Sequence, residues 1–172
     1  MQNSKTKIKT LRLILGDQLN LQHSWFKTVN SDVTYVLMEI RSETDYAWHH
    51  IQKVAGFFAA MQQFAKELQD QNHQVVYIKL NDKSNLQAFD KNCKALINKH
   101  QFTEFQYQLP DEYRVDEHLK TFTTSLTISS QVVDSEHFLS TRNELGEFFK
   151  GKKTYLMESF YRYMQKKHHL LM

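Results

Sequence analysis

Short runs of apolar residues recur along the chain, and most of them end in a cluster of polar residues. Residues 11–15 and 33–40 are almost continuously apolar rather than alternating. That pattern is typical of strands buried on both faces by helices. Three further runs, at residues 74–80, 104–109 and 126–133, have lengths and compositions suited to strands. The sequence therefore predicts five strands.

Longer amphipathic segments separate these runs. The clearest helix is expected over residues 46–71, because apolar residues recur there at intervals of three and four: Val54, Phe57, Phe58, Met61, Phe64, Ala65 and Leu68. Further helices are expected after residues 81–85, over 115–125 and from about residue 154. Strands that alternate with helices predict an α/β fold, a doubly wound (Rossmann-like) five-stranded parallel sheet with helices on both faces.

The order of the strands follows from the handedness of such folds. In right-handed doubly wound sheets the first strand commonly lies centrally, with the second and third on one side and the fourth and fifth on the other. Ligands bind where this order reverses, at the carboxyl ends of the first and fourth strands. We expect polar residues that follow three strands to surround this crevice: Gly16, Asp17, Gln18, Glu39, Glu43 and the loop 111–114.

Composition narrows the class of protein. The 172 residues are 41% hydrophobic, which suits one domain with its own core, and the net charge is only +3. No apolar run approaches the roughly 20 residues of a membrane helix, so no membrane association is expected. Cys93 is the single cysteine, which excludes an internal disulfide framework, and it falls on an apolar stripe that predicts burial. We expect a cytoplasmic protein with a disordered lead-in over residues 1–10.

Several familiar kinds of site are disfavoured. Neither of the two common glycine-rich phosphate-binding patterns, GxGxxG and GxxxxGK[ST], occurs around Gly16. His49 and His50 are adjacent and lack a third ligand at suitable spacing, which argues against a metal site. Neither Ser24 nor Ser42 has the flanking glycines of a nucleophile elbow. The strand ends therefore suit an aromatic ring system held by carboxylate, amide and backbone groups better than a pyrophosphate.

The last part of the chain differs in kind, because residues 138–172 combine aromatic residues with many cations. A basic patch of this type is able to bind phosphates, but an ordinary solvated helix face is the favoured interpretation. The aromatic surface of the C-terminal helix is also compatible with two arrangements: a dimer formed through this helix, or docking of the helix onto the sheet of its own chain.

Four separated motifs suggest a family. In chain order they are LRLILGDQLN, EIRSETDYAWHHIQKVAGFFAAMQQFA, PDEYRV and KKTYLMESFYRYMQKKHHLLM. Together they resemble the deoxyribodipyrimidine photolyase-related proteins, which are also called iron-sulfur bacterial cryptochromes and photolyases. The similarity covers residues 11–172 but only the first third of the family's length.

The resemblance implies a division of labour between domains. Family members continue into a helical domain that binds FAD and a 4Fe-4S cluster through four cysteines, and they repair photolesions in DNA with light. On this basis residues 11–137 are expected to be the antenna-binding domain, and 138–172 a linker and helix leading toward the helical domain. That domain, absent here, would be the partner, with damaged DNA bound only by the full-length protein. The fragment alone is not expected to repair DNA.

The resemblance also implies a ligand, a lumazine-type antenna chromophore, and a set of residues that hold it. Gly16, Asp17 and Gln18 match the family's GDQ turn, and Glu43 and Tyr46 match its E-x-x-Y motif. The remaining expected contacts lie along the second strand and in the loop after the fourth: Met38, Glu39, Ile40, Glu112 and Arg114. No catalytic or metal-binding residue is expected. The alternative is a freestanding α/β module that binds a small ligand or a partner without photochemistry.

Overall fold

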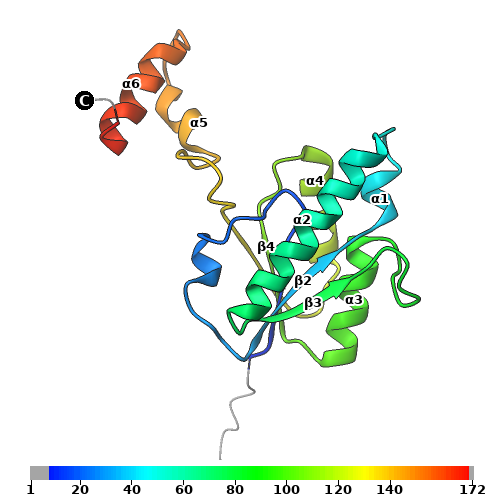
Figure 1. Cartoon of the computed structure of the whole chain (residues 1–172). Helices are drawn as coiled ribbons and strands as arrows, with labels where there is room; N and C mark the ends of the chain where they lie inside the picture. Colours follow the sequence, from blue (N-terminus) through cyan, green and yellow to red (C-terminus); the bar gives the residue numbers. More distant parts are fainter. Residues whose placement is uncertain (1–7, 171–172) are drawn as a thin grey trace, which may run out of the picture. The chain divides into compact units, whose positions relative to one another are not determined.

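Five parallel strands form one sheet in the computed structural model, which describes residues 8–170 (Figure 1). The strands are β1 (Thr10–Leu13), β2 (Val33–Met38), β3 (Gln74–Ile78), β4 (Glu104–Gln108) and β5 (Ser129–Val133). Their order in the sheet is β3-β2-β1-β4-β5. This confirms the predicted doubly wound α/β fold and places the reversal of strand order between β1 and β4. Most of the predicted lead-in, residues 1–7, lies outside the described residues, and β1 already begins at Thr10.

The helices largely follow the predicted ranges. They are the 3₁₀ helix η1 (Ser24–Phe26) and the α-helices α1 (Arg41–Thr44), α2 (Ile51–Asp70), α3 (Phe89–His100), α4 (Tyr113–Thr124), α5 (Glu144–Phe149) and α6 (Met157–His168). None of the helices in the described part of the chain is long and apolar enough to span a membrane.

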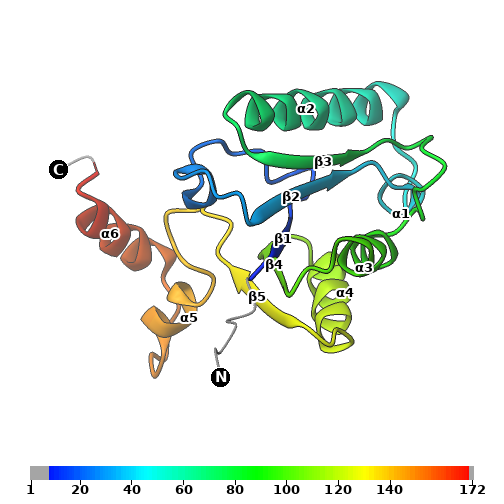
Figure 2. The same ribbon diagram turned by 90° about the horizontal axis from the view of Figure 1, so that it is seen from below.

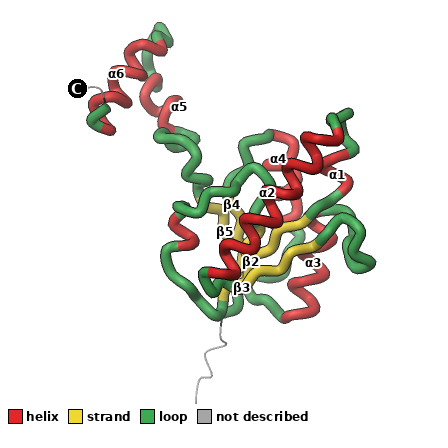
Figure 3. Tube along the Cα trace, viewed as in Figure 1, coloured by secondary structure: helices red, strands yellow, loops and turns green. Residues whose placement is uncertain are grey.

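The predicted start of the long helix at residue 46 is wrong. The helix begins at Ile51, after a loop that follows the four-residue α1 (Figure 3). His50 caps the helix, since its Nδ1 accepts a hydrogen bond from the backbone N–H of Gln52 at 3.2 Å. A side chain that satisfies one of the first free N–H groups fixes where a helix starts. Tyr46 therefore lies in a loop between two helices.

Helices cover the sheet from both sides, with α2 on one face and α3 and α4 on the other (Figure 2). Successive residues of β1 point to opposite faces, as strand geometry requires. Leu11 and Leu13 belong to the core cluster that contains the buried residues of α3 and α4, and Ile14 to the cluster that contains those of α2. Cys93 is fully buried in the first cluster, as its position on the apolar stripe of α3 predicted.

A row of polar side chains crosses the sheet on the α2 side. Arg12 Nε donates to Gln106 Oε1 at 2.8 Å, and Arg12 Nη1 donates to the hydroxyl of Tyr35 at 3.1 Å. Gln106 Nε2 in turn donates to Gln131 Oε1 at 3.1 Å. These four residues are direct partners across β2, β1, β4 and β5. The row therefore helps to fix the register of the strands.

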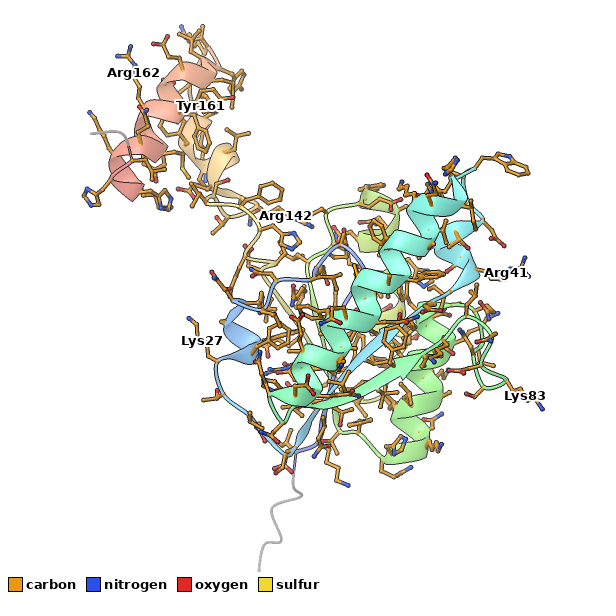
Figure 4. All side chains as sticks on the ribbon, viewed as in Figure 1. Lys27, Arg41, Lys83, Arg142, Tyr161 and Arg162 are labelled. Atoms are coloured by element: carbon orange, nitrogen blue, oxygen red, sulfur yellow. The ribbon has the colours of Figure 1, made fainter. Side chains whose placement is uncertain are left out.

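The chain divides into two compact units, Met1–Val133 and Asp134–Met172. In the second unit, aromatic side chains join α5 to α6, with Phe149 and Phe160 buried and the rings of Phe148 and Phe160 5.3 Å apart. Glu144 accepts a hydrogen bond from Tyr163 and pairs with Lys167. Figure 4 labels Tyr161 and Arg162 on α6, and both side chains are exposed. The candidate site described next lies wholly in the first unit.

Candidate ligand-binding cavity

A cavity of about 180 Å³ lies at the carboxyl ends of β1, β2 and β4. Residues that follow these strands meet there with α1, with the loop after it and with the first half of α2. The lining comprises Leu15, Gly16, Asp17, Met38, Ile40, Glu43, Thr44, Tyr46, His49, Lys53, Val54, Phe57, Phe58, Met61, Phe89, Pro110, Glu112 and Val115. The cavity thus occupies the switch point at which ligands of open parallel sheets bind.

The turn after β1 packs closely against α2. A Cβ atom at Gly16 would lie 3.0 Å from Met61 Sδ and 3.1 Å from Phe57 Cδ1. Such contacts are tighter than nine in ten real Cβ contacts, so any other residue would require the side chains of Met61 and Phe57 to shift by a few tenths of an ångström. Gly16 therefore allows the strand end and the helix to form adjacent walls of the cavity.

The walls are mainly apolar. Met38 and Ile40, at the end of β2, are buried, and Val115 of α4 is buried as well. Phe57 and Phe58 of α2 line the same space, and Phe57 is 44% exposed. An aromatic residue that is half exposed beside a cavity provides a surface on which a flat ring system can pack.

Charged residues surround the opening of the cavity, here called the mouth, which is bordered by Glu43, Tyr46 and Glu112. The Arg114 guanidinium forms a fork with Glu43, with Nη2 to Oε2 at 2.9 Å and Nη1 to Oε1 at 3.2 Å. Its Nε donates to Glu112 Oε1 at 2.8 Å, and its Cζ lies 4.3 Å from the centre of the Tyr46 ring. The hydrogen bond to Glu43, reinforced by both carboxylates, raises the pKa of Arg114 above its usual range. Arg114 itself is not among the lining residues.

A second set of polar side chains, Lys53 and His49, lines the cavity at the start of α2. Lys53 Nζ is 3.4 Å from His49 Nδ1, and the His49 ring meets the Tyr46 ring edge-on with centroids 5.5 Å apart. Asp17 lines the same cavity from the turn after β1. The lining therefore offers carboxylates, an ammonium and an imidazole. No group of three or more His, Cys, Asp or Glu side chains within residues 8–170 is arranged to hold a metal ion.

Gln18 is not among the lining residues, although it belongs to the predicted site. Its side chain is buried, and Oε1 accepts from the backbone N–H of Leu15 at 3.1 Å. Nε2 donates to the carbonyls of Gln108 and Leu109, each at 3.3 Å. The amide thereby ties the turn after β1 to the end of β4.

Glu39 is also buried and is not among the lining residues. Its Oε1 accepts from the Tyr77 hydroxyl at 2.7 Å and from Gln62 Nε2 at 2.8 Å, and its Oε2 accepts from the backbone N–H of Leu80 at 2.8 Å. Burial, followed by the hydrogen bond to Glu39 and the charge of its carboxylate, raises the pKa of Tyr77. This carboxylate therefore links β2 to β3 and α2.

Sequence reasoning missed the contribution of α2. The sequence predicts Val54, Phe57, Phe58 and Met61 only as part of one apolar helix face, without assigning them to a cavity. The apolar stripe of α2 is long, and only its second half is buried. The sequence did hold a signal that could have identified this wall: the apolar stripe of α2 is longer than the strands against which it packs, so part of it continues past the strand ends.

A sequence profile of the deoxyribodipyrimidine photo-lyase-related proteins matches residues 12–172. The chain belongs to this family. A (6-4) photolyase of Agrobacterium fabrum is similar to it, with 34% identity over 163 residues, which make up 94% of this chain and 32% of the relative. The chain therefore spans about a third of the length of this curated relative. The resemblance inferred from the four motifs is confirmed.

Proposed function

We propose that the first unit of this photolyase-related chain is an antenna domain that holds a lumazine-type chromophore in the cavity. One observation carries the proposal. The GDQ turn contributes Gly16 and Asp17 to the lining, and the E-x-x-Y motif contributes Glu43 and Tyr46. These two motifs are separate in the sequence but border the same space. Met38, Ile40 and Glu112, expected on weaker grounds, border it too.

The chemistry of the lining suits a fused heteroaromatic ring that carries a hydroxylated chain. Apolar and aromatic walls favour the ring, and polar groups at the mouth favour the chain. Asp17 and Glu43 would accept hydrogen bonds from ring N–H or ribityl hydroxyl groups, and Tyr46 would pack against the ring. When bound, such a chromophore absorbs light and passes the excitation energy to a flavin.

The proposal limits the role of this chain to collecting light. The resemblance implies that family members hold FAD and an iron-sulfur cluster, the latter through four cysteines, whereas this sequence has one cysteine, Cys93. We assign both cofactors, and binding of damaged DNA, to the helical domain of full-length family members. That domain would be the natural partner of this one.

Titration with dimethyl-ribityllumazine tests the proposal. We expect saturable binding, seen as a shift in the absorbance of the chromophore and a change in its fluorescence. Asp17→Ala and Glu43→Ala should each weaken binding by about 10-fold or more, because a hydrogen bond to a charged group contributes about 1.5–3 kcal/mol. Glu117→Ala is the matched control, since Glu117 pairs with Lys120 and does not line the cavity.

Two results would contradict the proposal. The first is the absence of saturable binding by the wild-type chain under conditions in which it is folded. The second is binding by Asp17→Ala and Glu43→Ala as tight as binding by Glu117→Ala. Either result would favour the alternative of an α/β module that acts without this chromophore.

A further inference from the structure

Arg114 contacts three lining residues of the cavity without lining it. Glu43 and Tyr46 lie in and just after α1, whereas Glu112 directly precedes α4. The guanidinium bonds to both carboxylates and lies over the Tyr46 ring. It is thus a single side chain that joins two segments of the mouth that are distant in the sequence.

The segment that contains Glu43 has little packing of its own. α1 has four residues, none of them buried, and its Ncap residue, Ile40, makes no side-chain cap. One external side chain ties its start, because the backbone N–H of Arg41 donates to Gln87 Oε1 at 3.1 Å. Isolated helical turns of this length are unstable, since the cost of nucleation is not recovered over so few residues. Arg41, labelled in Figure 4, projects outward and pairs only with Asp45 of the same segment among the ion pairs of the described residues. The contacts with Arg114 are therefore a main restraint on Glu43 and Tyr46.

We infer that Arg114 is a positioning residue, which holds the Glu43 carboxylate and the Tyr46 ring in place at the mouth so that they can retain the bound chromophore. The inference rests on the proposed function for the identity of the ligand. It replaces the expectation that Arg114 touches the ligand itself. It also assigns to Glu112 the role of a second anchor for the guanidinium.

The geometry distinguishes this arrangement from an ordinary surface ion pair. The side chains of Arg114 and Glu43 are 42% and 28% exposed, and a lone exposed pair contributes little to stability. Here one planar guanidinium forms a forked pair with Glu43, donates to Glu112 and also lies over the face of the Tyr46 ring. Lysine cannot reproduce this, since an ammonium is a point charge without the planar fork. Loss of Arg114 should thus loosen the mouth more than it destabilises the fold.

Hydrogen exchange without ligand gives the first test. In Arg114→Gln, the amides of residues 41–50 should exchange about 10-fold faster than in the wild type, with the melting temperature little changed. Arg114→Lys should restore this protection only in part. Lys120→Gln is the matched control, because Lys120 also lies on α4 and pairs with two carboxylates, Asp116 at 3.0 Å and Glu117 at 2.9 Å. It should leave residues 41–50 unchanged.

Titration with dimethyl-ribityllumazine gives the second test. Arg114→Gln should raise the dissociation constant about 10-fold, chiefly through faster release, and Lys120→Gln should not. Exchange over residues 41–50 that is equal in Arg114→Gln and Lys120→Gln would overturn the positioning role, whatever the ligand. Faster exchange with unchanged affinity would overturn its effect on retention. Faster exchange in a chain whose wild type binds no lumazine would refute the proposed function and leave the positioning role supported.

Discussion

The two halves of α2 present one continuous apolar stripe, but the structure uses them differently. In the second half, Phe64, Ala65 and Leu68 are buried, and so is Met61, which stands at the boundary between the halves and also lines the cavity. They belong to one core cluster, which also contains residues of β2. In the first half, Val54, Phe57 and Phe58 border the cavity, and Phe57 is almost half exposed.

The cause of the difference is the position of the sheet. Strand residues such as Tyr35 and Leu37 fill the space next to the second half of α2. The first half borders the turns and loops that follow the strands, and these leave a hollow. An amphipathic helix whose apolar stripe continues past the strand ends therefore has part of that stripe available for a ligand.

The largest expected effect comes from truncation in the buried half. Leu68 is fully buried, so Leu68→Ala should lower the free energy of unfolding by about 2–5 kcal/mol. Urea denaturation with a folded-state probe would measure this loss. Binding of the lumazine by the remaining folded protein should be unchanged. A loss below about 1 kcal/mol would show that this half is not the core that the burial indicates.

The second-largest expected effect is a loss of stability at alkaline pH, caused by burial of the Cys93 thiol in the core. Burial, and to a smaller extent the charge of Asp90, raises the pKa of Cys93 above its ordinary value of 9.0. Above that pH the unfolded chain loses the thiol proton while the folded chain retains it, so stability should fall as pH rises, by up to about 1.4 kcal/mol per pH unit. Urea denaturation at about pH 8 and pH 10 would measure the slope. Cys93→Ser should reduce it, and equal slopes in the two proteins would contradict burial of the thiol.

Truncation in the half that borders the cavity should give the smallest change in stability. Phe57→Ala removes a side chain that is 44% exposed, so we expect a loss of about 1 kcal/mol or less. Affinity for the lumazine should nevertheless fall several-fold, because a wall of the cavity is lost. Parallel denaturation and titration would separate the two effects. A stability loss equal to that of Leu68→Ala would remove the distinction between the halves.

Sequence reasoning was most successful where a general rule of folding acts. The handedness of crossover connections gave the strand order, and the exit of the first strand indicated Gly16 and Asp17 as cavity residues. It could not distinguish Asp17 from Gln18, because the amide of Gln18 is engaged by carbonyls at the end of β4, which lie far away in the sequence. Glu39 and Glu43 present the same difficulty.

Those two carboxylates follow the same strand and look equivalent in the sequence. Glu39 is buried among Tyr77, Gln62 and a backbone N–H, whereas Glu43 reaches the mouth. Only the packing of β3 and α2 decides which carboxylate is enclosed. The wall formed by Phe57 was missed for a similar reason, because helical periodicity identifies an apolar face without showing where the sheet beneath it ends.

Hydrogen exchange of the wild-type chain with and without dimethyl-ribityllumazine tests the central claim most directly. The account predicts that the ligand slows exchange in the turn 16–18, in residues 43–50 and in the first half of α2, with no change over residues 64–70. Unchanged exchange throughout, or protection confined to the second unit, would contradict a chromophore site in this cavity.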